Sequence, residues 1–230
     1  MAFTPFRKAG QFREEVRKWW SNLNDGEKVF WPLCGMNLIV FLAWRIPGLQ
    51  PFMMRWFMSN PGSQSRCLPL LLNTFSHYSL IHLGFNMFAL HSFIPNTVQV
   101  SGQQQFLALY LNAGVISSLA SMALKVAMGK TSYSLGASGA VLGVVAYHTT
   151  FYPDTKLCLI FLPMFTFSAA TAVKAMIALD FTGLVLGWKI IDHMAHLAGV
   201  FSGLGWAYGA PLFYGKALTT WHNLKTAKSD

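Results

Sequence analysis

The chain has 230 residues, of which 53% are hydrophobic and 11% are charged, against about 25% charged in an average soluble domain. That composition predicts a membrane protein. The formal net charge of +9 comes from lysines and arginines near the ends of apolar segments and in the two tails, which favours membrane flanks over a nucleic-acid surface. The three cysteines lie far apart in apolar sequence, so we predict neither a zinc site nor a disulfide framework, but free, buried thiols.

Residues 1–28 alternate basic, acidic and aromatic positions, a pattern typical of an amphipathic helix at a membrane surface. No apolar run follows these charges, as one would in a secretory signal peptide. We therefore expect a basic amphipathic segment at 1–28, a single undivided core at 29–213 and a polar basic tail at 214–230.

The core contains six apolar runs, each compatible with the roughly 20 helical residues that cross a hydrocarbon layer of about 30 Å. The predicted spans are Val29–Ile46, Leu68–Ile94, Gln105–Met128, Leu135–Tyr152, Leu157–Leu179 and His193–Phe213. The sequence thus predicts an all-α, polytopic membrane protein.

Two connections between these runs are unusual. Pro47–Cys67 is rich in methionine and aromatic residues, so we expect it to be ordered in the headgroup layer beside the spans. Asp180–Asp192 has glycines and mixed polarity, which favour greater mobility. It is interpreted either as a gate or as a mere connector.

Six crossings would bring the starts of spans two, four and six to one face of the membrane. The residues gathered there are polar: His77, His82 and Asn86 from span two, Ser138 from span four, and His193 and His196 from span six. A single residue of this kind more often joins helices by hydrogen bonds. Several at one depth favour an intramembrane site, because ionisable groups are costly there.

A serine, a histidine and an amide donor suit acyl transfer, in which histidine moves the serine proton and the amide stabilises an oxyanion. We see no clear acidic member of a Ser-His-Asp set inside the spans, so we expect a dyad. Asp192, one turn before His196, is either its orienting partner or an interfacial anchor. The His-Glu-x-x-His pattern of zinc peptidases is absent, and we expect neither a metal nor a cofactor.

Three motifs resemble, in their order, those of the rhomboid intramembrane serine proteases: His82-x-x-x-Asn86, Gly136-Ala137-Ser138-Gly139 and Ala195-His196-x-x-Gly199-x-x-x-Gly203. The resemblance covers about residues 29–213. It is greatest to the mitochondrial branch of the family, through the stretches 160–167, 186–189 and 192–197. The resemblance implies a six-helix core.

The resemblance also implies a role for each site residue. Ser138 would be the nucleophile and His196 the general base and acid, a choice between His193 and His196 that spacing alone leaves open. Asn86 and His82 would stabilise the oxyanion, with the backbone N–H of Ser138. The motif glycines would serve close helix packing, namely Gly136, Gly139, Gly199 and Gly203.

By the same resemblance, the protein is expected to be a cofactor-independent serine endopeptidase of the mitochondrial inner membrane. Its expected partners are the lipid bilayer and single-span transmembrane substrates, including a mitophagy kinase precursor, and no nucleic acid. Mitochondrial members carry an extra span before the core. No stretch before Val29 is apolar enough to be one, so the chain resembles a core form, truncated or processed.

Two other functions are weighed against the protease. A rhomboid-fold protein can bind membrane clients without cleaving them, but the known pseudoproteases lack the serine or the histidine that this chain retains. A small transporter could use His77, His82 and Asn86 as a polar path, but the sequence has no inverted repeat or pair of broken helices. Lysines and arginines number ten on one predicted face and seven on the other, which leaves the orientation open.

Overall fold

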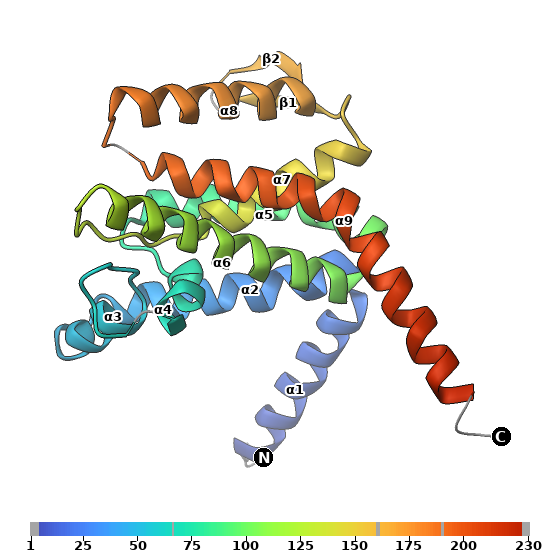
Figure 1. Cartoon of the computed structure of the whole chain (residues 1–230). Coiled ribbons are helices and arrows are strands. Elements are labelled where there is room, and N and C mark those ends of the chain that lie inside the picture. The colour runs from blue at the N-terminus through green and yellow to red at the C-terminus, as the bar shows by residue number, and fades with distance from the viewer. Residues whose placement is uncertain (1–4, 66, 160–161, 190, 227–230) are drawn as a thin grey trace.

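A bundle of helices makes up most of the protein (Figure 1). The computed structural model describes residues 5–65, 67–159, 162–189 and 191–226. Within them, the bundle consists of α2 (Asp25–Ala43), α5 (Leu80–Ser101), α6 (Gln103–Ala127), α7 (Ser138–Phe151), α8 (Ala169–Leu186) and α9 (His193–Thr226). By length and composition, α2, α6 and α8 are apolar enough to cross a membrane. The architecture agrees with an all-α, polytopic fold, while the six-span membrane core stays a prediction.

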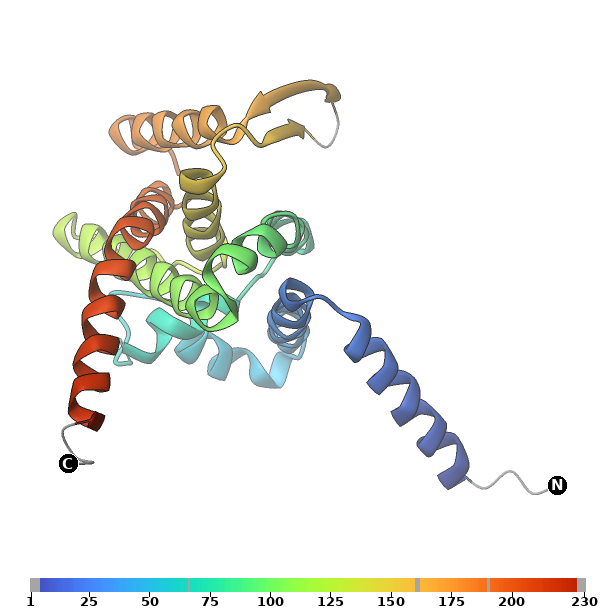
Figure 2. The same ribbon diagram turned by 90° about the vertical axis from the view of Figure 1, so that its right-hand side faces the viewer.

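The N-terminal segment forms a separate helix, α1 (Pro5–Asn22), which projects away from the bundle (Figure 2). The bundle begins at a capping box. The side chain of Asn24 accepts a hydrogen bond from the backbone N–H of Glu27 at 2.9 Å, and the Glu27 carboxylate accepts one from the N–H of Asn24 at 2.8 Å. The first bundle helix therefore begins before Val29. At the other end of the chain, α9 continues past Phe213 to Thr226.

The predicted second span is wrong in its first half. The run that starts at Leu68 forms the short helix α4 (Cys67–Leu72) and the 3-10 turn η2 (Asn73–Phe75), and α5 begins only at Leu80. Ser79 caps α5 by accepting a hydrogen bond from the backbone N–H of His82. A continuous helix is disfavoured because the buried side chains of Asn73, Ser76 and His77 accept tertiary hydrogen bonds, from Ser118, Trp44 and the backbone N–H of Ala137.

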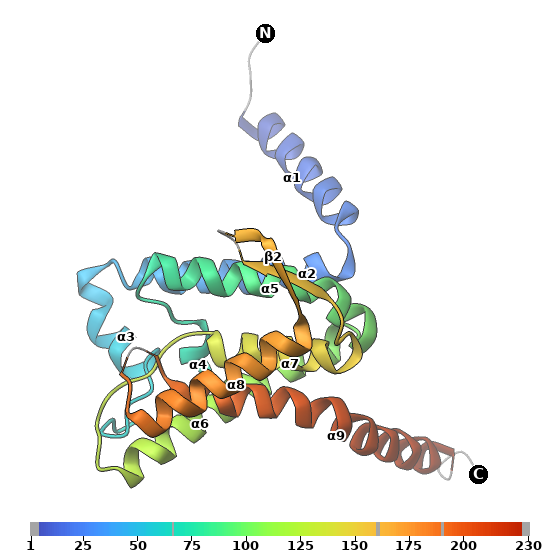
Figure 3. The same ribbon diagram turned by 90° about the horizontal axis from the view of Figure 1, so that it is seen from above.

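The predicted fifth span is also wrong in its first half. Residues 156–168 form an antiparallel hairpin of β1 (Lys156–Leu159) and β2 (Leu162–Ser168). Phenylalanine, threonine and leucine suit a strand, and the helix starts where Ser168 accepts a hydrogen bond from the N–H of Thr171 at 3.1 Å. α8 then runs to Leu186 and lies on the outer side of α7 and α9 (Figure 3). Residues 160 and 161 lie outside the described residues.

The connection Asp180–Asp192, predicted as a gate, lies mostly in a helix. Asp180 to Leu186 are the last turns of α8, and Gly187 ends that helix in the left-handed conformation with φ 71°. Only residues 187–192 connect α8 to α9. Gating would therefore be confined to this shorter connection or would have to include α8.

The long connection Pro47–Cys67 is described except for residue 66. It contains η1 (Pro47–Leu49) and α3 (Gln50–Trp56), and it buries Met53 and Met58 against Trp44 in a small cluster of their own. Its position in the headgroup layer stays a prediction. The cysteines are free, but Cys67 and Cys158 are exposed rather than buried.

The helix α7 lies at the centre of the bundle, where it contacts α5, α6, α8 and α9. Nearly all of its residues from Gly139 to Thr149 are buried, as expected of a helix that is apolar on every side. Its neighbours contribute large buried side chains to the same core, including Phe106 and Tyr110 of α6. Ser138, the first residue of α7, is thus held at the end of the best packed helix in the fold.

Candidate active site

Glycines bring α7 and α9 into backbone contact. A Cβ atom on Gly199 would lie 2.2 Å from the carbonyl oxygen of Gly139, and one on Gly203 would lie 2.0 Å from that of Gly143. Neither distance is possible for a real side chain, because two backbones cannot yield to it. Of the motif glycines, Gly139, Gly199 and Gly203 therefore lie where the two helices touch, whereas Gly136 lies against the ring of His82.

This packing brings the predicted nucleophile and base together. The Oγ of Ser138 lies 3.0 Å from Nε2 of His196, which is in the first turn of α9. That separation is within hydrogen-bond reach, as proton transfer between a serine and a histidine requires. His193, which sequence spacing did not exclude, points its ring elsewhere, toward α8.

A carboxylate completes the set, and sequence analysis missed it. Asp180 of α8 is 2% exposed, and its Oδ2 lies 3.3 Å from Nδ1 of His196. Its Oδ1 lies 2.8 Å from Nδ1 of His193. Ser138, His196 and Asp180 therefore follow one another through contacts of 3.0 Å and 3.3 Å, whereas the sequence analysis named only the first two. The available signal was an acidic residue within the apolar run 169–186, since charges at membrane depth usually mark a site.

The side chain of Asp192 binds groups other than the ring of His196. It caps α9 by accepting from the backbone N–H of Ala195 at 3.1 Å. Its second oxygen pairs with Lys125 Nζ at 2.9 Å and accepts from the hydroxyls of Ser121 and Ser134. Asp192 thereby ties the start of α9 to α6 and to the loop before Ser138.

The loop before Ser138 is held on both sides. The backbone N–H of Gly136 donates to the carbonyl of Asn73 at 3.0 Å, and that of Ala137 donates to Nε2 of His77 at 3.3 Å. Ser134 pairs with Ser59 through two backbone hydrogen bonds. The ring of His77 thus accepts a hydrogen bond from the backbone. In a transporter, it would instead line the path of the transported molecule.

The ring of His82 lies against the same loop. A Cβ atom on Gly136 would come 2.7 Å from Cε1 of His82, and Gly136 has φ +134°, so glycine is required there on both grounds. Asn86 is 6% exposed, and its amide donates to the backbone carbonyl of His82 at 2.9 Å. An amide nitrogen carries two N–H donors, and this bond uses one.

Comparison with known proteins agrees with this arrangement. Residues 64–213 match the Rhomboid domain. The chain belongs to the rhomboid family. The resemblance drawn from the sequence motifs is thereby confirmed.

The relatives that this chain matches include mitochondrial rhomboids of animals and yeast. The human presenilin-associated rhomboid-like protein, mitochondrial, is 47% identical over 224 residues, which cover 96% of this chain and 59% of that protein. Presenilin-associated rhomboid-like protein A, mitochondrial, of Danio rerio is 44% identical over 91% of this chain and 56% of the relative. Rhomboid protein 1, mitochondrial, of Saccharomyces cerevisiae is 32% identical over 78% and 53%. The chain spans less than two thirds of the length of these relatives. It is a mitochondrial multi-pass membrane protein of the rhomboid family.

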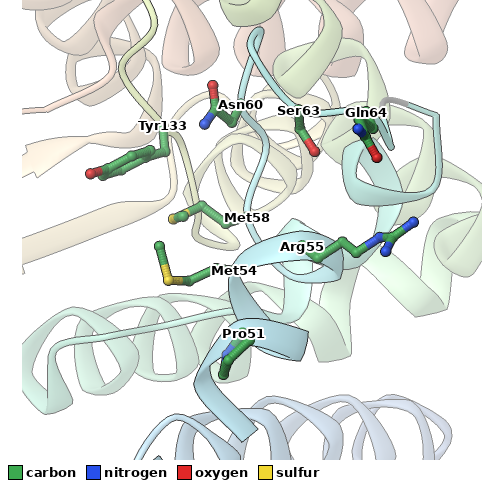
Figure 4. A pocket seen from close by; sticks show the side chains of 8 residues that line it. All are labelled: Pro51, Met54, Arg55, Met58, Asn60, Ser63, Gln64 and Tyr133. Atoms are coloured by element: carbon green, nitrogen blue, oxygen red, sulfur yellow. The ribbon is translucent and has the colours of Figure 1, made fainter.

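Two cavities lie on the side of the fold that holds Ser138. A small one, of about 30 Å³, adjoins Ser138 itself, and its wall includes the polar residues Asn73, Ser117, Ser118, Ser134 and Asp192. A larger one, of about 390 Å³, lies between α3 and the loop before α7 (Figure 4), lined by Pro51, Met54, Arg55, Met58, Asn60, Ser63, Gln64 and Tyr133. Of these two cavities, only the small one is lined by Ser138. The large one is lined by Tyr133, whose neighbour Ser134 pairs with Ser59.

Proposed function

We propose that this rhomboid is an intramembrane serine protease that cuts peptide bonds within or beside the transmembrane segments of its substrates. The observation that carries the proposal is the line from Ser138 Oγ to His196 Nε2, at 3.0 Å, and from His196 Nδ1 to Asp180 Oδ2, at 3.3 Å. Packing alone does not call for three polar side chains from three helices in this order.

Acylation follows from these positions. His196 Nε2 takes the proton of Ser138 while Oγ attacks the carbonyl carbon of the scissile bond. Asp180, whose Oδ2 lies 3.3 Å from Nδ1 of His196, favours the tautomer with hydrogen on Nδ1 and a free lone pair at Nε2, and its negative charge stabilises the imidazolium that forms. His196 then gives the proton to the leaving amine as the carbon–nitrogen bond breaks, which leaves an acyl group on Ser138.

The oxyanion is assigned to donors on two helices. Ser138 is the first residue of α7, where backbone N–H groups have no partner within the helix. His82, whose ring lies against Gly136, and the second N–H of Asn86 are proposed as the side-chain donors. The negative charge of the oxyanion would thus be stabilised by donors of α7 on one side and by donors of α5 on the other.

Deacylation needs water, which lipid does not supply. The small cavity beside Ser138 is polar, and its volume of about 30 Å³ exceeds the roughly 10 to 15 Å³ that one water occupies. A water molecule there would reach the acyl group, give a proton to His196 Nε2 and release the acid as Ser138 regains its hydrogen.

The proposed substrates are imported single-span proteins of the mitochondrial inner membrane, including a mitophagy kinase precursor, as the resemblance to mitochondrial rhomboids implies. An intact helix hides its carbonyls in hydrogen bonds, so the enzyme must unwind its substrate locally. Substrates with glycine, proline or other helix-weakening residues near the cut are therefore favoured.

The test is labelling of the whole protein, reconstituted in liposomes, with a serine-directed phosphonate probe, alongside cleavage of a single-span substrate. We expect labelling and cleavage in the wild type and neither in Ser138→Ala or His196→Ala. The double variant should be no worse than either single one, because residues that act as a unit are not additive. Cleavage that persists in Ser138→Ala would refute the proposal that this protein is a serine protease with Ser138 as its nucleophile. Client binding without labelling of the wild type would favour a rhomboid that does not cleave.

A further inference from the structure

His193 is a buried imidazole that has no task in the proposed reaction. It is the first residue of α9, it is 5% exposed, and its Nδ1 lies 2.8 Å from Oδ1 of Asp180. The other oxygen of the same carboxylate lies 3.3 Å from Nδ1 of His196. Asp180 therefore joins two imidazoles, and its contact with His193 is the shorter of the two.

We propose that His193 is a positioning residue that fixes the carboxylate of Asp180 for His196, an inference that rests on the proposed function. A buried carboxylate needs hydrogen-bond donors, because an oxygen without one bears the cost of its lost hydration. The Nδ1–H of His193 supplies the donor at Oδ1. With that oxygen held, Oδ2 stays directed at His196 instead of turning about the bonds of the side chain.

The ring of His193 packs against Gly183 of α8. Gly183 follows Asp180 by three residues on the same face of α8. A Cβ atom there would lie 2.3 Å from Cε1 of His193 and 2.4 Å from its Nε2, so the ring lies directly on the helix backbone. The ring of Trp188 is also near, with centroids 6.1 Å apart. Any larger residue at 183 would push the imidazole away from Asp180.

The protons of this cluster explain how His193 acts on the reaction. With hydrogen on Nδ1 in both rings, Oδ1 of Asp180 accepts from His193, Oδ2 faces Nδ1 of His196 at 3.3 Å, and His196 keeps its Nε2 lone pair for Ser138. When His196 takes the proton of Ser138, the negative charge of Asp180 stabilises the imidazolium that forms. The hydrogen bond that His193 donates to Asp180 disperses part of this negative charge. The titratable groups facing His193 are Asp180 of α8 and His196 of α9, while the adjacent Asp192 is paired with Lys125 of α6.

Three substitutions of His193 separate its donor from its bulk. Asparagine can place an amide nitrogen where Nδ1 lies, glutamine places it nearer to Nε2, and alanine removes it. His148→Ala is the matched control, since His148 is also buried, at 2% exposure, but lies near the other end of α7. We would measure the rate of phosphonate labelling of the whole reconstituted protein, and the pH at which this rate is half-maximal, with thermal unfolding as the check of folding.

We expect His193→Ala to lower the labelling rate on the order of 10- to 100-fold, the loss typical of removing the hydrogen-bond partner that orients a metal-binding histidine. The pH of half-maximal rate should shift as well, and His193→Asn should restore most of the rate and the pH dependence. A merely structural role would leave that pH unchanged.

Several results would overturn this inference. They are a wild-type rate and pH profile in His193→Ala, an equal change in His148→Ala, and a higher rate for glutamine than for asparagine. This last comparison decides the matter if the alanine variant does not fold. Wild-type protein that is never labelled would refute the proposed function, and this inference with it, whereas a labelled wild type with an unaffected His193→Ala refutes this inference alone.

Discussion

At the scale of single residues, the site depends on a carboxylate that is 2% exposed among apolar helices. Such a charge is costly unless it is paired, and Asp180 has an imidazole at each oxygen. We therefore expect a substitution of Asp180 to change the rate of cleavage strongly.

Asp180→Asn should lower cleavage by up to about 10⁴-fold, the effect of the same change in a Ser-His-Asp protease, because an amide can stabilise the wrong tautomer of His196. The measurement is single-turnover cleavage in liposomes. Asp154→Asn, at an exposed turn between α7 and β1, is the control. A rate near that of the wild type for Asp180→Asn would reduce the mechanism to a Ser138–His196 dyad.

Asn86→Ala should lower turnover by about 10² to 10³, the cost of removing one oxyanion donor, while substrate binding is kept. His82 and the N–H groups of α7 would support the residual rate. Steady-state kinetics separate the two effects, since the loss belongs in kcat and not in KM. Unchanged kinetics in a folded Asn86→Ala protein would remove this residue from the mechanism.

At the scale of elements, the contact between α7 and α9 is what makes the site possible. The two helices meet backbone to backbone, and this contact sets the 3.0 Å between Ser138 and His196. Small changes in that contact should therefore affect stability and activity together.

Gly203→Ala should destabilise the protein by about 1 to 3 kcal/mol, the usual cost of overpacking, and should lower the labelling rate. Its Cβ would lie 2.0 Å from the carbonyl oxygen of Gly143. Gly205→Ala is the matched control, because a Cβ on Gly205, in the same helix, meets nothing within 4 Å. Thermal unfolding in detergent compares the two, and equal midpoints would argue against the glycine contact.

The link from Asp192 to α6 predicts a pH dependence. Burial alone would raise the pKa of Asp192, but the Lys125 ammonium and the hydrogen bonds from Lys125, Ser121 and Ser134 outweigh it and lower the pKa below 3.8. A carboxylate with a depressed pKa in the folded state contributes stability above its unfolded pKa, and that contribution is lost as the pH falls through the folded value.

We therefore expect the stability that depends on Asp192 to be constant above about pH 5 and to decline below pH 3.8. Asp192→Asn should be less stable than the wild type at neutral pH, and the gap should close in acid. Unfolding midpoints of the two proteins between pH 3 and 7 test this, the range over which an aspartate of this kind titrates. A gap that stays constant with pH would mean that Asp192 acts only as a helix cap.

At the scale of the whole molecule, the six bundle helices predict that the chain crosses the membrane six times. Cys67, before α5, and Cys158, in the hairpin between α7 and α8, would then lie on opposite faces, and both thiols are free and exposed. An impermeant maleimide added outside sealed vesicles of uniform orientation should label one of them and spare the other. Variants that keep a single cysteine identify which. Labelling of both from one side would contradict six crossings.

Much of this molecule can be predicted from its sequence, because composition and local spacing act over short distances. The apolar runs determined a polytopic helical protein, and small residues at intervals of four determined which helices pack closely. Ser138 and His196 were predicted from motifs and from the number of predicted membrane crossings, and the structure places their side chains in contact. Their catalytic roles remain the proposal.

Tertiary structure alone decided the remaining features. The sequence assigned Leu68 and Leu157 to membrane helices because apolar runs look alike, but buried hydrogen bonds of residues 73–77 and strand pairing of 156–168 made other structures more stable. Asp180 was placed in a loop, and its role depends on α8 folding back onto α9, which no local pattern encodes. What pairs with a buried charge is determined by the packing of distant helices, since only a partner at hydrogen-bond distance offsets its lost hydration.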